Sequence, residues 1–376
     1  MQTISSPNSH FVSQPITRQR TRHFTPNWFA ATMGTGILSI CLAQFPTLPL
    51  LWQAGRLLWM VNILLFASLS VLYARKWLLH RREAWNGLEH PVVSMFAGCI
   101  PMGFATIVNG TIIYGLPHMG AAGVPVATSL WWIDAGIALL SGFGIPFLMF
   151  TRQDHKLEQM NATWLLPIVA CEVTAASGGL LLPHIDGATA QMTVLFASYV
   201  LWAFSVPLAL SIITILFLRL ALHKLPPAGM AATAFLALGP TGTGALGLLL
   251  FAANGRDVLD ANGLGPLAGA ICGAAFLGAI LLWAYGLWWL GMGIAMTARY
   301  IRRGLPFNLG WWGYTFPIGV FALATLRLSA QIPVPAIGLF GDLLVAGLAA
   351  IWLVVGIRTC RGAIDGTLFH DPSLEA

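Results

Sequence analysis

The sequence has few charged residues. Asp, Glu, Lys and Arg together make up 9% of its 376 residues, whereas 57% are hydrophobic. A soluble globular domain carries about 25% charged residues, which form its water-facing surface. A chain with so little charge has no such surface. The composition therefore excludes an ordinary soluble protein and predicts one that crosses a membrane several times.

The sequence also lacks the motifs of common enzyme classes. It contains no HExxH zinc motif, no GxSxG nucleophile motif and no GxxxxGK[ST] phosphate-binding loop. The nine histidines lie in predicted loops, in tails or at the edges of apolar segments, so no membrane segment offers paired ligands for haem or a metal. The five cysteines form no CxxC pair, which argues against a metal cage or a disulfide framework. We therefore predict that the chain is not an enzyme and has no metal site or cofactor.

Ten apolar segments are long enough to cross a bilayer, which requires about 20 residues. They lie at 27–44, 53–74, 91–113, 127–150, 162–182, 190–218, 231–252, 263–295, 309–328 and 336–357. The 26 residues before the first segment lack the apolar core of a signal peptide. We expect a cytoplasmic N-terminal tail at 1–26, a ten-helix transport domain at 27–358 and a cytoplasmic C-terminal tail at 359–376.

Lys and Arg are distributed unevenly between the two sides that these segments define. Sixteen of the 19 lie in the tails and the even-numbered loops, and only Arg56, Arg256 and Arg327 are left for the other side. Positively charged loops stay in the cytoplasm. The asymmetry predicts that both termini are cytoplasmic. It also accounts for the net charge of +6 without a nucleic-acid partner.

Glycine and proline breaks recur in the odd-numbered segments at a nearly constant interval. With Gly34, Pro101, Pro167, Pro240 and Pro317 as markers, the spacings are 67, 66, 73 and 77 residues. Irregular backbone at membrane depth is tolerated only where it is buried in protein or lines a water-filled path. We therefore predict an all-α membrane protein of five helical hairpins, with kinked odd helices in an inner ring around an axis and even helices outside. The predicted kinks along this axis are Gly34, Gly36, Pro101, Gly103, Pro167, Gly239, Pro240 and Gly242.

Few ionisable residues lie inside the apolar segments. Glu172 is near the middle of the fifth segment and is either a proton-coupling carboxylate of a carrier or a structural partner for a threonine or a helix end. Asp134 is interpreted as a structural anchor near a membrane interface, and the tryptophan pairs, such as Trp131–Trp132, as interface anchors. Arg327 either attracts anions to the outer mouth of a path or extends to the lipid headgroups.

Four stretches of the sequence resemble the tellurite-resistance/dicarboxylate transporter family, which includes malic-acid permeases, sulfite exporters and slow-type anion channels. They are FTPNWFAATMGTGILSI, WLLPIVACEVTAASGGLL, FLALGPTGTGAL and GWWGYTFPIGVFALATLRLS. The similarity extends over about residues 24–358. The resemblance implies ten helices in five hairpins around a central pore, commonly in a homotrimer. It also implies that a phenylalanine closes this pore, and the motif match identifies it as Phe316, next to Pro317.

These observations predict a membrane transporter for small inorganic or dicarboxylate anions. We expect a plasma-membrane permease for C4-dicarboxylates such as malate. Within transport, the alternatives are a sulfite exporter and a channel that conducts halide or nitrate. An alternative from another class is an anion-sensing membrane scaffold that carries nothing, but the near-absence of soluble segments argues against it. The sequence does not distinguish a channel from a proton-coupled carrier.

Overall fold

The computed structural model describes residues 20–374, so most of the predicted N-terminal tail, including Arg18, lies outside the described residues. Within residues 20–374 the regular elements are helices alone. The α-helices are α2 (Ala30–Leu42), α3 (Pro49–Leu79), α4 (Arg81–Glu89), α5 (Cys99–Gly110), α6 (Leu116–Met119), α7 (Gly123–Thr151), α8 (Leu165–Leu181), α9 (Ala188–His223), α10 (Leu238–Asn254), α11 (Arg256–Ala261), α12 (Gly265–Ile301), α13 (Thr315–Ser329) and α14 (Pro335–Ile364). The architecture is therefore all-α, as predicted.

Nine helices in the described part of the chain are long and apolar enough to cross a membrane, and they correspond to the second to tenth predicted segments. The first predicted segment forms the four-residue 3-10 turn η1 (Pro26–Phe29) and the 13-residue helix α2. This stretch is shorter than the others. The multi-pass membrane fold is confirmed, whereas the count of ten spans stays a prediction.

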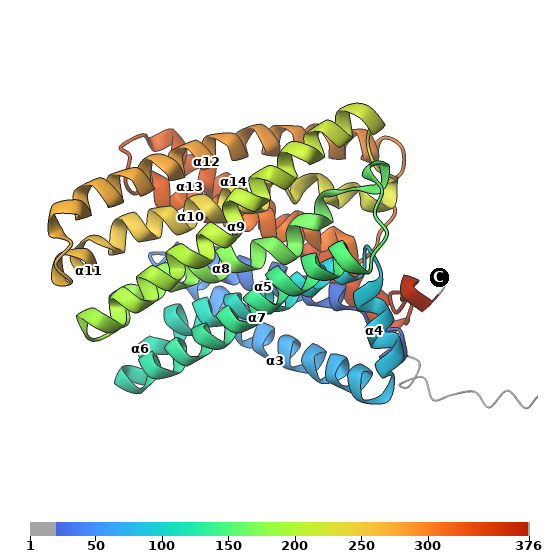
Figure 1. Cartoon of the computed structure of the whole chain (residues 1–376), viewed down its shortest axis with the longest axis horizontal. Coiled ribbons are helices and arrows are strands. Elements are labelled where there is room, and N and C mark those ends of the chain that lie inside the picture. Colours follow the sequence, from blue (N-terminus) through green and yellow to red (C-terminus); the bar gives the residue numbers. More distant parts are fainter. Residues whose placement is uncertain (1–19, 375–376) are drawn as a thin grey trace, which may run out of the picture.

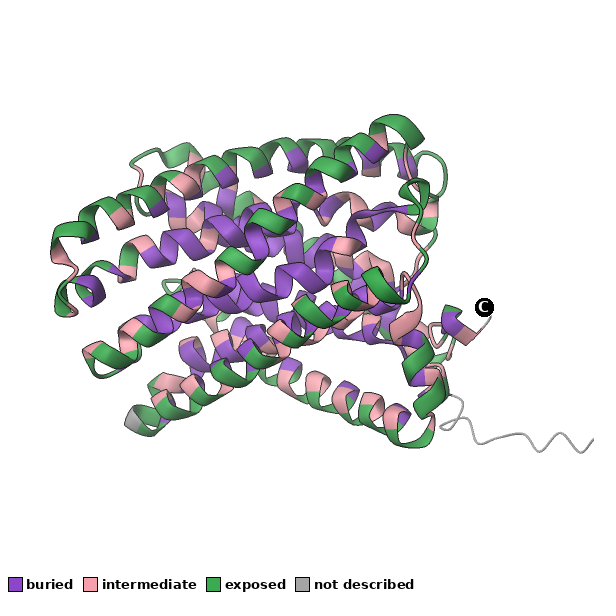
Figure 2. Cartoon of the chain, viewed as in Figure 1, coloured by how far each residue is buried: buried purple, intermediate pink, exposed green. Residues whose placement is uncertain are grey.

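The odd-numbered segments are buried and the even-numbered ones are exposed (Figure 2). Buried residues make up 94% of the most apolar stretch of Ala162–His184 and 89% of that in Ala228–Asn254, but only 11% of that in Pro49–Leu79. All 13 residues of α2 are buried. Because apolar side chains on the outer helices face away from the protein, we assign that surface to lipid.

The inner helices contact one another in a closed ring. Helix α2 contacts α5, α5 contacts α8, α8 contacts α10, α10 contacts α13, and α13 returns to α2. The outer helices pack against this ring, with α3 on α2, α7 and α9 on α8, α12 on α10 and α14 on α13 (Figure 1). Helices far apart in the sequence are thereby brought around one axis.

Each inner helix begins with a 3-10 turn. These turns are η1, η2 (Ser94–Gly98), η6 (Ala162–Trp164), η8 (Ala228–Phe235) and η9 (Leu309–Tyr314). In α5, α8, α10 and α13 the third residue is proline: Pro101, Pro167, Pro240 and Pro317. The N–H groups of a first helical turn have no intrahelical partner, so a proline there removes no helical hydrogen bond. The predicted proline kinks are thus close to junctions between 3-10 and α-helix at the starts of the inner helices.

Both described ends of the chain lie on the face where the inner helices begin, which we call the terminal face. Helix α14 continues past residue 358 to Ile364, so the predicted C-terminal tail starts as helix. The Arg20 guanidinium (Nη2) donates a hydrogen bond of 3.0 Å to the carbonyl oxygen of Ile364. The chain then turns at Gly366, whose φ of 77° favours glycine. Residues 367–374 follow and form our C-terminal segment.

Two side chains of α7 lie deeper than the sequence predicted. Trp131 is 0% exposed and its indole Nε1 donates a hydrogen bond of 2.8 Å to the carbonyl oxygen of Thr174, whereas Trp132 is 45% exposed. Asp134 is also fully buried, and its Oδ2 accepts a hydrogen bond of 2.7 Å from the Thr174 hydroxyl. The interpretation of Trp131 and Asp134 as anchors at a membrane interface is wrong. They join α7 to α8 instead.

Candidate functional site

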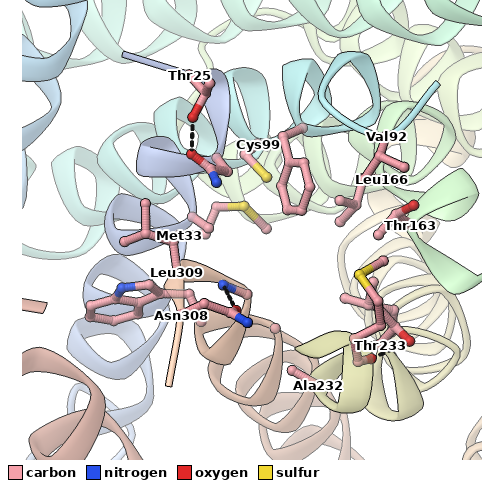
Figure 3. Close-up of a pocket in the computed structure, with 18 of the residues that line it drawn as sticks. Thr25, Met33, Val92, Cys99, Thr163, Leu166, Ala232, Thr233, Asn308 and Leu309 are labelled. Atoms are coloured by element: carbon pink, nitrogen blue, oxygen red, sulfur yellow. Dashed lines mark hydrogen bonds between the residues drawn. The ribbon is translucent and has the colours of Figure 1, made fainter. Parts of the chain in front are cut away.

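A cavity of about 440 Å³ lies among the first turns of the five inner helices, on the side of the terminal face. Figure 3 shows part of its lining, in which side chains from widely separated parts of the sequence surround one space. The lining comes from η1 and α2, from η2 and α5, from η6 and α8, from η8 and α10, and from η9 and α13. The C-terminal segment completes it with Thr367, Leu368, His370 and Pro372.

The side chains around the cavity carry no fixed charge. Among the described residues that line it there is no Lys, Arg, Asp or Glu, and the polar groups are mainly asparagine and threonine. Asn308 holds two first turns in place, because its Oδ1 accepts a hydrogen bond of 2.8 Å from the N–H of Gly310 and its Nδ2 donates one of 2.9 Å to the carbonyl oxygen of Gly229. Burial lowers the pKa of His23, on the same face, and the positive charge of Arg22 lowers it further.

The electrostatic character of the cavity therefore comes from the backbone. An α-helix has a partial positive charge of about +0.5 at its N-terminus, where N–H groups lack intrahelical partners. All five inner helices begin next to this cavity. Their aligned dipoles attract an anion, and the absence of charged groups from the described lining keeps this attraction weak. Weak binding is what rapid passage requires.

The inner end of the cavity is apolar. The lining residues farthest along the inner helices include Met33, Met102, Val169 and Phe316, and each is at most 4% exposed. Gly239 lies among them, and a Cβ atom added there would meet nothing within 4 Å. The predicted gate residues Phe316 and Pro317 thus line the cavity, as does the predicted kink residue Gly239.

Four other predicted glycines lie at close contacts between inner helices. A side chain at Gly34 would overlap Thr315 of α13, one at Gly36 would overlap Thr106 of α5, and one at Gly103 would overlap Thr32 of α2. Gly242 of α10 is packed against the backbone of Phe321 in α13. The structure therefore gives Gly34, Gly36, Gly103 and Gly242 a role in ring packing, and a role for them in lining a path stays a prediction.

Glu172 is fully buried on α8, beyond the cavity. Its Oε2 accepts a hydrogen bond of 3.2 Å from the Ser205 hydroxyl of α9. Its Oε1 has no hydrogen-bond partner among the described residues. Arg327 is half-buried in the last turn of α13, at the end of that helix opposite the cavity. A positive charge there is favoured by the helix dipole.

Sequence reasoning did not identify most of the cavity lining, although the repeat contains a signal for it. The residue just before the marker glycine or proline is Met33, Leu166, Gly239 and Phe316 in four of the five inner helices, and all four line the cavity. Leu166, Gly239 and Phe316 are each the second residue of their helix, whereas Met33 is the fourth residue of α2. The C-terminal segment has no such signal.

Comparison with known proteins identifies relatives along nearly the whole chain. A family model described as voltage-dependent anion channel matches residues 23–360. The sulfite efflux pump of Arthroderma otae is 36% identical over 351 residues, which cover 92% of each chain. That of Trichophyton rubrum is 35% identical, with 93% of each chain covered. The malic acid transport protein of Schizosaccharomyces pombe is 24% identical over a match that covers 94% of this chain and 81% of that protein.

Proposed function

The chain belongs to the voltage-dependent anion channel family and is an anion transporter rather than an enzyme, and we propose that sulfite is the anion it carries. This family is the one that the motif resemblance predicted. The sulfite efflux pumps among the relatives support sulfite over malate, which the sequence had placed first. The relative with a name that refers to malic acid is more distant.

The observation that carries this proposal is the uncharged cavity at the five helix starts. The free-energy cost of moving an ion out of water rises steeply with its charge, and without a cation in the lining little offsets it. Near neutral pH, sulfite is partly present as the singly charged hydrogen sulfite ion, whereas malate is doubly charged. Helix dipoles alone thus favour hydrogen sulfite over the malate dianion.

The path that we propose continues from the cavity along the axis of the inner ring. Ten helices in five hairpins surround it, and Phe316 closes it at the inner end of the cavity. The position of Phe316 in the lining and its burial support this assignment. The junction before Pro317 starts α13 at the point where the ring of Phe316 meets the cavity, which supports a role for Pro317 in orienting the gate.

We also propose an orientation and an assembly. The excess of Lys and Arg in the tails and the even-numbered loops supports a cytoplasmic terminal face in the plasma membrane. Anions then enter the cavity from the cytoplasm, which suits export. The homotrimer rests on the family resemblance alone. Arg327 lies at the opposite end, where it attracts anions or contacts lipid headgroups.

Glu172 is proposed as the group that couples transport to protons. Its unpartnered Oε1 and complete burial support a carboxyl that gains or loses a proton during the cycle. The alternative is structural, because the hydrogen bond from Ser205 also ties α9 to α8.

Flux measurements with purified protein in liposomes test the substrate. We expect labelled sulfite to leave loaded vesicles faster than malate at neutral pH, and protein-free vesicles to show neither flux. Faster malate than sulfite would support the second candidate, a dicarboxylate permease, which the malic acid transport relative favours. Fast chloride or nitrate flux would indicate a channel of the same family. Absence of every flux would leave the anion-sensing scaffold.

A further inference from the structure

The C-terminal segment forms one wall of the cavity. Thr367, Leu368, His370 and Pro372 belong to the lining, together with the helix starts. The family model matches residues 23–360, so this wall lies beyond the residues that the model matches.

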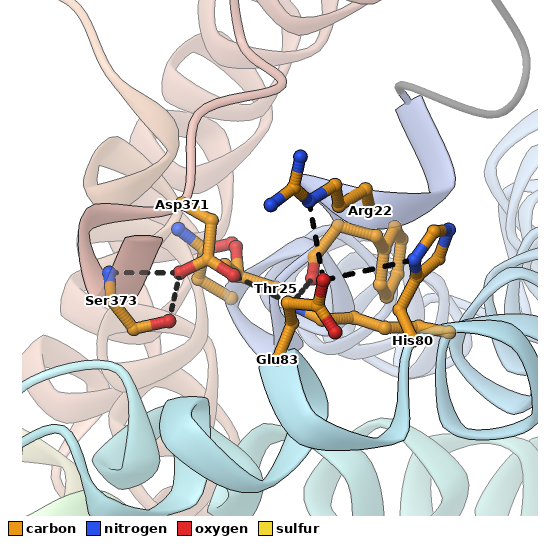
Figure 4. A network of polar contacts seen from close by, with 9 residues as sticks. Arg22, Thr25, His80, Glu83, Asp371 and Ser373 are labelled. Atoms are coloured by element: carbon orange, nitrogen blue, oxygen red, sulfur yellow. Dashed lines mark hydrogen bonds and ion pairs between the residues drawn. The ribbon is translucent and has the colours of Figure 1, made fainter. Parts of the chain in front are cut away.

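A buried ion pair holds the segment in place (Figure 4). The Lys76 ammonium of α3 donates a hydrogen bond of 2.6 Å to Oδ2 of Asp371 and one of 2.8 Å to the carbonyl oxygen of Phe24. The other carboxylate oxygen, Oδ1, accepts hydrogen bonds from the N–H and the hydroxyl of Ser373, at 3.0 and 2.6 Å. The side chains of Lys76 and Asp371 are 2% and 0% exposed.

Such a pair is costly to bury unless both charges are fully hydrogen-bonded, and removal of one partner leaves an uncompensated charge. The pair joins three parts of the chain: the end of α3, the turn before η1 and the C-terminal segment. An aromatic contact supports it, because the ring of Phe369 stacks on that of Trp28 with centroids 4.8 Å apart. The Cζ atom of Arg20 lies over the ring of Phe369, 5.4 Å from its centroid.

We propose that residues 367–374 are a cover over the mouth of the cavity, and that the Lys76–Asp371 pair latches it. The role of the cover in limiting entry of anions rests on the proposed function. The cover has only one short turn of regular structure, η10 (Pro372–Leu374), and Gly366 provides a hinge at its start. Thr367, His370 and Pro372 are exposed, and they line the cavity. Release of the latch exposes the helix starts to water on the terminal face.

A thiol in the cavity reports on the cover without any transport. Cys99 lines the cavity and is 1% exposed. The experiment uses the full chain carrying Cys272→Ser and Cys360→Ser. Besides Cys99, it then contains only Cys41 and Cys171, which are buried and do not line the cavity. A negatively charged, membrane-impermeant methanethiosulfonate is added, and its attachment to Cys99 is followed by mass spectrometry. Addition of Cys99→Ser to this background shows the residual signal.

We expect Asp371→Asn to raise the rate of labelling at Cys99 by about tenfold, because the open state of the cover becomes more populated. A stop codon after Gly366 should raise it at least as much. Asp365→Asn is the matched control, since Asp365 is a nearby exposed acid outside the latch. It should leave the rate unchanged. If Asp371→Asn misfolds because Lys76 is left unpaired, the truncation combined with Lys76→Met removes both charges.

An unchanged labelling rate in a truncated protein that elutes and melts like the wild type would overturn the cover. An equal rise in Asp365→Asn would do the same, because it would indicate general loosening of the terminal face. Labelling of Cys99 does not require any anion to be carried. Failure of the sulfite assay would therefore count against the proposed function only, and the labelling rates would still test the cover.

Discussion

Replacement of Phe316 by alanine tests whether its ring closes the path at the inner end of the cavity. Phe316 is the second residue of α13, it lines the cavity, and it is 3% exposed. Alanine removes the ring and keeps the helix start, because Pro317 and the 3-10 turn before it are unchanged. The gap then joins the cavity to the axis beyond it.

The size of the effect follows from what an anion must overcome at the ring. Moving a side chain away from its rotamer costs about 0.5–1.5 kcal/mol. The ring face also carries partial negative charge, and electrostatic interactions between rings and ions are worth roughly 0.5–2 kcal/mol. The barrier removed is therefore about 1–3.5 kcal/mol, which corresponds to a roughly 5- to 370-fold larger anion current. Phe316→Leu keeps part of the steric block and should give a smaller increase.

Anion currents in planar bilayers and thermal unfolding in detergent are measured on the same preparations. Phe321→Ala is the matched control, because Phe321 is a fully buried phenylalanine of the same helix that stacks on Trp283 away from the cavity. It should lose about 3–5 kcal/mol of stability and gain no current. If Phe316→Ala inserts normally but conducts like the wild type, or if it is destabilised as much as the control, the ring packs between helices and is no gate.

Three further predictions concern coupling, ring packing and the terminal face. Glu172→Gln should reduce the pH dependence of sulfite flux between about pH 5 and about pH 7.5 to the part that follows from protonation of sulfite itself, while the protein stays folded, and an unchanged dependence would assign Glu172 the structural role. Gly34→Ala should lower the thermal midpoint through a loss of roughly 1–3 kcal/mol, whereas Gly239→Ala should melt like the wild type, because only Gly239 faces open space; equal midpoints would contradict the packing role. A hydrogen bond from Arg152 lowers the pKa of Glu89, so this pair stabilises the fold above the pKa of the unfolded carboxyl and the contribution is lost as the pH falls through the folded pKa. Arg152→Ala should thus lower the midpoint at neutral pH and match the wild type under acidic conditions, and a pH-independent difference would argue against this contact.

The membrane fold and the alternation of inner and outer helices were predictable from the sequence. Each depends on chemistry that is local in the chain. Apolar length decides which segments cross a bilayer. Glycine or proline at a nearly constant interval indicates where the helical backbone is irregular, which in a membrane requires protein or water nearby. Only the resemblance of the motif around Pro317 to the family singled out Phe316 among 21 phenylalanines, and its role as a gate stays a prediction.

Other features depend on which segments meet in space. In the sequence, nothing distinguishes Gly239 from the glycines at 34, 36, 103 and 242. The packing of the inner helices places these four against a neighbouring helix, whereas Gly239 faces the cavity. Asp134 was misjudged because its depth is set by contact between α7 and α8. The latch joins Lys76 to Asp371 across most of the chain, and no local pattern marks either residue. Hydropathy and backbone chemistry act within one segment, whereas burial, charge pairing and the shape of a cavity arise only when distant segments pack together.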